Sequence, residues 1–217
     1  MPGCWEIPQS VLVGILHTDN TTLAWSFGLR NLIIPGQILP VAGMPYDMSR
    51  NVICQATLEH GFDWCFHYDS DVVPPRDAIL KLMSRNQPII SGVYCRRSPP
   101  HSIPVMQKNG NWVTEYPPNA IIEVDVVGAG CLLIHRSVLE RFKQQPQRPG
   151  KTWFDWRVDM QGFMAPELCK SEDFCFCDHS RKLGYKVLVD TSIQCRHIGL
   201  GEATLGQFLP CNTNTIT

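Results

Sequence analysis

The first half of the chain alternates short apolar runs with segments whose apolar residues recur at helical spacing. Runs of β-branched and aromatic residues predict strands, and the 3.6-residue recurrence predicts helices. The expected strands are 11–17, 37–43, 63–68 and 88–94, and the expected helices are 20–33, 50–61 (after Ser49) and 74–85 (with prolines in its first turn). Strands that alternate with helices in this way predict a largely parallel α/β sheet with right-handed crossovers.

The second half of the chain has a different pattern, with shorter apolar runs and more proline. We expect short strands near Val105 and Trp112. Residues 120–136 should hold an alternating strand, a Gly-Ala-Gly turn and a second apolar strand. An irregular stretch follows over 144–170, then a helix between Ser171 and Gly184 and a strand over 186–190. We therefore expect one α/β domain over 1–217, in which the second half supplies antiparallel strands and loops.

The composition fits a globular protein and excludes some classes of function. Hydrophobic residues make up 44% and charged residues 18% of the chain, and the net charge of −1 gives no overall attraction to nucleic acid or anionic membrane. No apolar run approaches the ~18 residues that cross a bilayer, and the N-terminus lacks the pattern of a signal peptide. We expect a cytoplasmic protein without a membrane span. The ten cysteines form no C-x-x-C pair, which favours buried thiols over a structural zinc site.

Candidate chemistry begins where the strand 63–68 ends in Asp69-Ser70-Asp71. Ligands of open α/β sheets bind beyond the carboxyl ends of the strands. Residues i and i+2 of an extended segment point to the same side, so both carboxylates can face one site. Such a pair suits Mg²⁺ or Mn²⁺ with substrate phosphates. Asp and Ser are also ordinary turn residues, and the triplet by itself leaves that alternative open.

Two later segments add candidate groups. Ser171, Glu172 and Asp173 read either as a helix cap with acids in its first turn or as a buried carboxylate that acts as a general base. His197 is either a structural histidine or a ligand that favours Mn²⁺. Arg50 and Arg196 are either surface charges or groups that neutralise phosphate.

Four segments then stand in order along residues 10–200: VLVGILHTD, MSRNVICQATLEHGFDWCFHYDSDVVPP, VVGAGCLLIHRSVLERF and SEDFCFCDHSRKLGYKVLVDTSIQCRHIG. Together they resemble a small glycosyltransferase of the GT-A fold, close to the family 2-type enzymes. The resemblance implies a Rossmann-like, mainly parallel sheet flanked by helices, with a small antiparallel acceptor-side portion. It also implies a nucleotide-sugar-binding half over 10–94, an acceptor-side half over 95–200 and a tail over 201–217.

The resemblance implies a role for each matching residue. Asp69, Asp71 and His197 are the expected metal ligands for Mn²⁺ or Mg²⁺, and Asp173, beside Glu172, is the expected catalytic base of an inverting transfer. The expected contacts to the nucleotide sugar, a UDP-sugar being favoured, are Thr18, Asp19, Arg50, Asp69, Ser70 and Asp71. The expected acceptor-side residues are Gly128, Ala129, Gly130, Arg96, Arg97 and Trp153.

Two departures from the family pattern bear on the reaction. The first strand ends in LHTDN rather than the more usual Pro-Thr-Tyr-Asn type, and there is no clear Q-x-x-R-W motif of processive members. The second departure favours a single transfer over polymer synthesis. The acceptor stays open between a glycan, a lipid and a hydroxymethylated DNA base, and Arg96, Arg97 and His101 either contact phosphate there or form a solvated loop.

Two other classes of function compete with a glycosyltransferase. A nucleotidyltransferase would carry a glycine-rich, basic loop near residues 17–25, and LHTDNTTLAW has none. A binding module of the same fold would have lost the chemistry, whereas Asp69, Asp71, Asp173 and His197 are all present. Trp153, Phe154 and Trp156 either stack on a sugar or base or fill the core.

Overall fold

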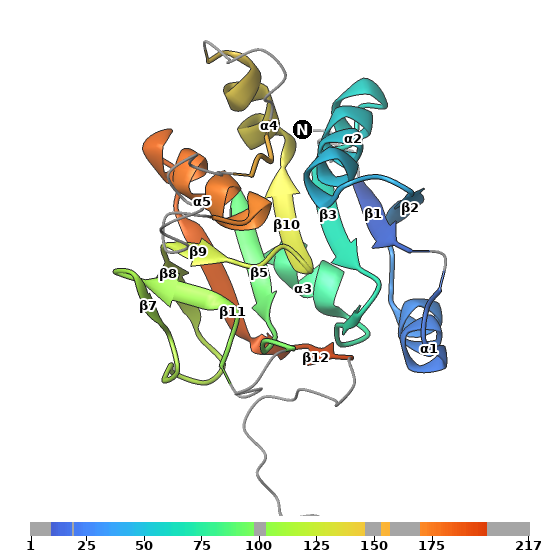
Figure 1. The fold of residues 1–217 in the computed structure, drawn as a ribbon, viewed down its shortest axis with the longest axis horizontal. Helices are drawn as coiled ribbons and strands as arrows, with labels where there is room; N and C mark the ends of the chain where they lie inside the picture. Colours follow the sequence, from blue (N-terminus) through green and yellow to red (C-terminus); the bar gives the residue numbers. More distant parts are fainter. Residues whose placement is uncertain (1–9, 19, 98–102, 146–152, 157–169, 199–217) are drawn as a thin grey trace, which may run out of the picture.

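The central layer is a seven-stranded mixed β-sheet, seen in a computed structural model that describes residues 10–18, 20–97, 103–145, 153–156 and 170–198 (Figure 1). In sheet order its strands are β2 (Gly36–Ala42), β1 (Val11–His17), β3 (Trp64–Asp69), β10 (Cys131–His135), β5 (Ile89–Val93), β11 (Val187–Gln194) and β8 (Ile121–Val124). All run in one direction except β10 and β8, which are antiparallel to their neighbours. The predicted mixed, mainly parallel α/β fold is confirmed.

Helices cover both faces of this sheet. They are α1 (Leu23–Asn31), α2 (Tyr46–Glu59), α3 (Ala78–Ser84), α4 (Arg136–Lys143) and α5 (Glu172–Lys182). The buried residues form two apolar clusters, one on each face. One cluster joins the sheet to α2, α4 and α5, and the other joins it to α1 and α3. Because strand residues alternate between faces, each strand of the middle of the sheet contributes to both clusters.

Two small antiparallel sheets flank the carboxyl edge of the main sheet. The first contains β7 (Asn111–Trp112), β6 (Met106–Lys108) and β9 (Val126–Val127), and it is the antiparallel portion expected in the second half. The second pairs β12 (Arg196–His197) with β4 (Val72–Val73). This pairing returns the end of the described chain to the turn that carries Asp69 and Asp71.

Several expected helix boundaries were wrong, for local reasons. Ser49 does not precede α2 but lies in its first turn, where its N–H donates to the Pro45 carbonyl at 2.9 Å. The two prolines do not lie in the first turn of α3, which begins at Ala78. The ring of Pro75 disfavours helical backbone at Pro74, so the chain stays extended until it has passed both residues.

Two features of the second half were not predicted. Helix α4 was missed because it is short, although Val138, Leu139 and Phe142 recur at helical spacing and are buried. Strand β10 inserts between β3 and β5, antiparallel to both, a pairing that depends on distant segments. Within the part of the chain that the structure describes, no helix is long and apolar enough to cross a membrane.

Candidate functional site

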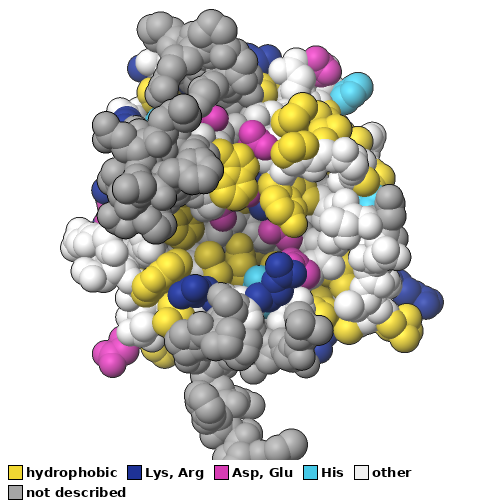
Figure 2. Space-filling model, viewed as in Figure 1, with side chains coloured by type: hydrophobic (Ala, Val, Ile, Leu, Met, Phe, Trp, Pro, Cys, Tyr) yellow, Lys and Arg dark blue, Asp and Glu magenta, His cyan; other side chains and the backbone are white. Residues whose placement is uncertain are grey.

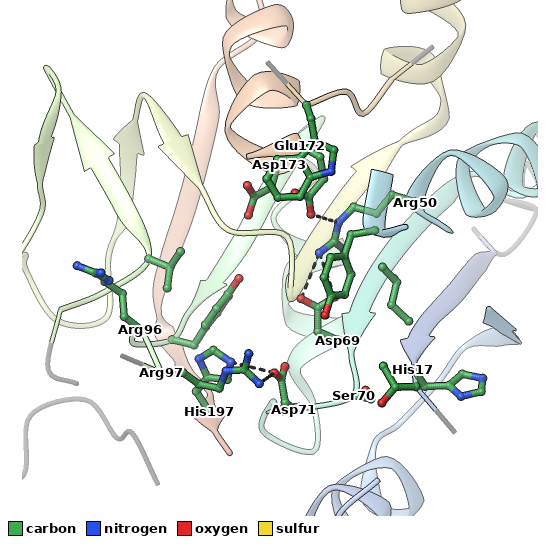
Figure 3. A pocket seen from close by; sticks show the side chains of 16 residues that line it. His17, Arg50, Asp69, Ser70, Asp71, Arg96, Arg97, Glu172, Asp173 and His197 are labelled. Carbon is green, nitrogen blue, oxygen red and sulfur yellow. Dashed lines mark hydrogen bonds and ion pairs between the residues drawn. The ribbon is translucent and has the colours of Figure 1, made fainter. Parts of the chain in front are cut away.

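A cavity of ≈ 720 Å³ opens at the edge where β1, β3, β5 and β11 end. Figure 2 shows acidic and basic side chains gathered in this part of the surface, and Figure 3 shows them pointing toward one another. The lining residues that carry the argument are Arg50, Asp69, Asp71, Arg97, Asp173 and His197. The fold therefore brings side chains from distant segments into one site.

Arg50, from α2, is the most connected side chain of the site. Its Nε donates to Glu172 Oε1 at 3.1 Å, and its Nη2 donates to Asp69 Oδ2 at 3.2 Å. Its Nη1 donates to the Ala129 carbonyl at 3.4 Å. Only 3% of the side chain is exposed. Each nitrogen of the guanidinium thus has an oxygen partner within the protein. Arg50 also lines the cavity, and its expected contact with the nucleotide sugar stays a prediction.

The charge of Arg50 is fixed by these neighbours. Burial alone lowers the pKa of Arg50, but the charges of Asp69, Glu172 and Asp173 outweigh it and raise that pKa above its ordinary value. A permanently charged guanidinium among carboxylates offsets their repulsion. Arg50 therefore allows several acids to share one buried edge of the sheet.

Asp71 lies further toward solvent and faces two basic side chains. Arg97 Nη1 donates to Asp71 Oδ2 at 2.8 Å, and His197 Nε2 lies 3.4 Å from the same oxygen (Figure 3). The Ile198 N–H donates to the Asp71 carbonyl at 2.7 Å, which fixes the turn against β12. The structure thus brings Asp71 and His197 together, as the sequence predicted, and adds Arg97.

The other ring nitrogen of His197 defines the tautomer. His197 Nδ1 lies 2.6 Å from the Cys95 carbonyl oxygen, and a carbonyl only accepts, so Nδ1 carries the proton. In the neutral ring, Nε2 then presents its lone pair to Asp71. Two electron-rich groups that face each other in this way suit a shared cation, and a histidine held by a backbone carbonyl is the usual arrangement at metal sites.

Glu172 and Asp173, at the start of α5, differ in their surroundings. Glu172 is buried and bound to Arg50, and burial, followed by the charge of Asp173, raises the pKa of Glu172. Asp173 lines the cavity, and its Oδ1 accepts from the Ser171 hydroxyl and from the Phe174 N–H. Burial raises the pKa of Asp173, although Arg50 acts in the opposite direction. Asp173 is the better placed of the two to exchange a proton with a bound molecule.

The Gly-Ala-Gly segment lies behind the acids. Tyr94 Oη accepts from the Gly130 N–H at 3.0 Å, and a Cβ on Gly128 would lie 2.1 Å from that oxygen. A Cβ on Gly130 would lie 3.1 Å from Asp69 Oδ2. Glycine is therefore needed here because Tyr94 and Asp69 approach the backbone closely. The segment does not itself line the cavity, so its expected acceptor-side role is replaced by support of Asp69 and Arg50.

Of the two tryptophans within residues 144–170, Trp153 packs in the core and Trp156 lines the cavity. Trp153 is 1% exposed, and its Nε1 donates to the Leu139 carbonyl at 2.9 Å. The expected acceptor-side role of Trp153 is therefore wrong, because the ring packs in the core. Trp156 is 43% exposed and lines the cavity, as do Arg96 and Arg97. The guanidinium of Arg96 lies 5.0 Å from the Trp112 ring.

Two of the remaining predicted residues line the cavity near the end of β1. Thr18 and Ser70 line it, whereas Asp19 and His101 lie outside the described residues. A second hollow of ≈ 500 Å³ adjoins this side, between the end of β1 and residues 43–49. His17 and Tyr46 line both hollows and were missed by the sequence reading, since a single exposed aromatic beside a strand end has no distinctive pattern.

Comparisons with known proteins show a similar fold but do not assign the chain to a family. No protein-family model and no curated protein matches the sequence. Among solved structures, the crystal structure of A197 from STIV has TM-score 0.63 and 16% identity, covering 91% of this chain and 95% of that chain. This likeness shows the fold alone.

Two further solved structures are more distant. Apo-UDP-glucose pyrophosphorylase has TM-score 0.43 and 10% identity, covering 87% of this chain and 76% of that chain. A glycosyltransferase involved in glycosylation of the major capsid of PBCV-1 has TM-score 0.34 and 12% identity, covering 73% of this chain and 77% of that chain. Both are nucleotide-sugar or glycosyl-transfer enzymes by name, and at this distance neither bears on the assignment of the site.

The ion pairs of Arg50 predict a large difference between two arginine substitutions. Arg50→Met leaves the buried Glu172 carboxylate without its cation, which costs about 3–5 kcal/mol of unfolding free energy. The matched control is Arg136→Met, which removes an i,i+4 pair with Glu140 at 31% and 47% exposure and costs about 0–1 kcal/mol. Urea unfolding measures both. Equal stabilities of the two variants would contradict the central role of Arg50.

Proposed function

We propose that this chain is a metal-dependent glycosyltransferase that moves a sugar from a nucleoside-diphosphate sugar to a hydroxyl acceptor in a single inverting transfer. The observation that carries the proposal is the convergence of Asp69, Asp71 and His197 with Asp173 around one cavity at the carboxyl edge of the sheet. This arrangement combines a place for a cation and phosphates with a separate carboxylate for proton transfer.

The nucleotide is assigned to the side of the cavity near β1. Thr18 and Ser70 offer hydroxyl groups there, and the adjoining ≈ 500 Å³ hollow beside Tyr46 offers space and an aromatic face for a base. The diphosphate then lies toward Asp71. A UDP-sugar remains the favoured donor on the sequence resemblance.

The residues present fit a divalent cation of the Mn²⁺ or Mg²⁺ type. Asp71 supplies a carboxylate, His197 presents Nε2 toward it, and Asp69 lies on the same turn. A cation bound there supplies charge that stabilises the departing diphosphate. Arg97 pairs with the same Asp71 oxygen that faces His197, and a cation held there would compete with this exposed guanidinium, which could then pair with a phosphate.

The transfer itself needs one proton acceptor. In the proposed reaction the acceptor oxygen attacks the anomeric carbon, the bond from that carbon to the diphosphate breaks, and the hydroxyl proton passes to Asp173. The nucleoside diphosphate leaves with the electron pair. Attack from the side opposite the leaving group inverts the anomeric centre. The pKa of Asp173, raised by burial, makes its carboxylate a stronger base than an exposed aspartate.

The acceptor is assigned to the part of the cavity lined by Arg96 and Arg97, which lie away from His17 and Ser70 (Figure 3), and Trp156 also lines the cavity. An exposed indole suits stacking on a sugar or a base, and arginines suit an acceptor that carries phosphate. A glycan, a phosphorylated lipid and a modified nucleic acid all remain within this class.

Nucleotide binding provides the direct test of the donor site. UDP, GDP, CMP and dTDP are each added with and without Mn²⁺, and the melting temperature is measured. A ligand at ~100 times its dissociation constant adds about 2.7 kcal/mol to the stability of the folded state. We expect a shift that requires Mn²⁺ with one of these nucleotides and is lost in Asp71→Ala. The absence of a shift with every nucleotide would contradict the proposal.

The role of Asp173 is tested by Asp173→Asn and by the pH dependence of transfer. The base must be deprotonated, so the rate falls as the pH drops through the pKa of Asp173, which lies above its ordinary value of 3.8. Asp173→Asn lowers kcat by about 10²–10⁴-fold and removes this acidic limb. The rate of UDP release from the donor, measured across pH, reports both the lower kcat and the loss of the acidic limb. Nucleotide binding by the variant is the control for an intact donor site. Near wild-type turnover in Asp173→Asn would assign Asp173 to helix capping.

A further inference from the structure

A second cluster of metal-binding groups lies in the core, apart from the cavity. Cys54 of α2 and Cys65 and His67 of β3 are each 0% exposed, and their ligand atoms lie within 4.8 Å of one another. Cys65 and His67 are two residues apart on β3, so they share one face of the strand, and that face packs against α2 (Figure 1). Helix and strand therefore supply the three groups from opposite sides.

The distances within the cluster match those around a bound thiophilic ion. His67 Nε2 lies 3.6 Å from Cys54 Sγ and 3.5 Å from Cys65 Sγ. Metal–sulfur and metal–nitrogen bonds of about 2.3 and 2.0–2.1 Å at a tetrahedral angle put sulfur and nitrogen about 3.6 Å apart. Both sulfur–nitrogen separations thus match those that a single bound ion would impose, and all three ligand atoms lie within 4.8 Å of one another.

Hydrogen bonds within the cluster leave one ring nitrogen without a partner. A ring nitrogen has either one proton or one lone pair in its plane, so Nε2 pairs with only one of the two sulfurs at a time. The opposite nitrogen, His67 Nδ1, is buried and has no hydrogen-bond partner in the described structure. The edge of the His67 ring meets Phe154, with ring centroids 4.9 Å apart, so the surroundings supply apolar contact there.

The geometry points to a buried site for one thiophilic metal ion, Zn²⁺ or Cu⁺, held by the two thiolates and His67 Nε2. Thiolate and imidazole ligands select these ions, whereas Mg²⁺ and Mn²⁺ prefer carboxylates. Binding releases the proton of each thiol that is not already ionised. Because the three ligands are buried, the ion enters as the chain folds.

The location gives this site a structural role beneath the cavity. Cys54 follows Arg50 by one helical turn on α2, and His67 precedes Asp69 by two residues on the same face of β3. An ion between Cys54 and β3 therefore ties the helix that carries Arg50 to the strand that carries Asp69. This site does not depend on the proposed transferase activity.

The test uses the full chain expressed in minimal medium with Zn²⁺, with a copper salt or with Co²⁺. We expect one metal ion per chain by native mass spectrometry after dialysis against EDTA, with elemental analysis separating zinc from copper. The cobalt protein should show a sulfur-to-cobalt charge-transfer band, which carboxylate ligands do not give. Asp71→Ala should keep this band, since it alters only the cavity site.

Substitutions then locate the ion. Cys54→Ser should lose the band and the bound metal, whereas the matched control Cys177→Ser, another fully buried cysteine outside the cluster, should keep both. A metal-free wild-type chain without the band would overturn the site, and this result needs no variant to fold. Retention of the band in folded Cys54→Ser, or loss of the metal in Asp71→Ala, would overturn it as well.

Discussion

The Arg50 guanidinium, enclosed between Asp69 and Glu172, is the contact on which the geometry of the site depends. It joins α2 and β3, which are consecutive in the chain, to the distant α5 through hydrogen bonds of 3.1 and 3.2 Å. Without a buried cation, the carboxylates of Asp69, Glu172 and Asp173 would repel one another at the same edge of the sheet. Arg50 therefore fixes where Asp69 stands, and the turn after Asp69 sets the direction of Asp71.

The sheet topology places the remaining groups around that contact. The carboxyl ends of β1, β3, β5 and β11 meet at one edge, and the short β4–β12 pairing returns His197 to Asp71. The insertion of β10 between β3 and β5 brings the Gly-Ala-Gly segment under Asp69, where only glycine leaves room for Tyr94. The arrangement of side chains around the cavity thus follows from strand order and one buried ion network.

The sequence predicted the elements of the first half and the fold class, because β1, β3 and β5 are short apolar runs and α2 has a clear helical recurrence. It also identified Asp69, Asp71, Asp173 and His197, which the structure gathers around one cavity. Sequence reading did not show that Arg50 pairs with buried carboxylates or that Trp153 packs in the core, because a pattern along the chain does not reveal burial or ion-pair partners. The Cys54, Cys65 and His67 cluster was missed for the same reason: its members are adjacent only after α2 packs on β3.

The most direct test of the central claim is a crystal structure of the chain with Mn²⁺ and the nucleoside diphosphate that gives the largest thermal shift. The account predicts a cation bound by Asp71 and by Nε2 of His197, the diphosphate beside it with Arg97 moved away from Asp71, and Arg50 still paired with Asp69 and Glu172. A nucleotide bound outside this cavity, or a cation that contacts neither Asp71 nor His197, would contradict the account.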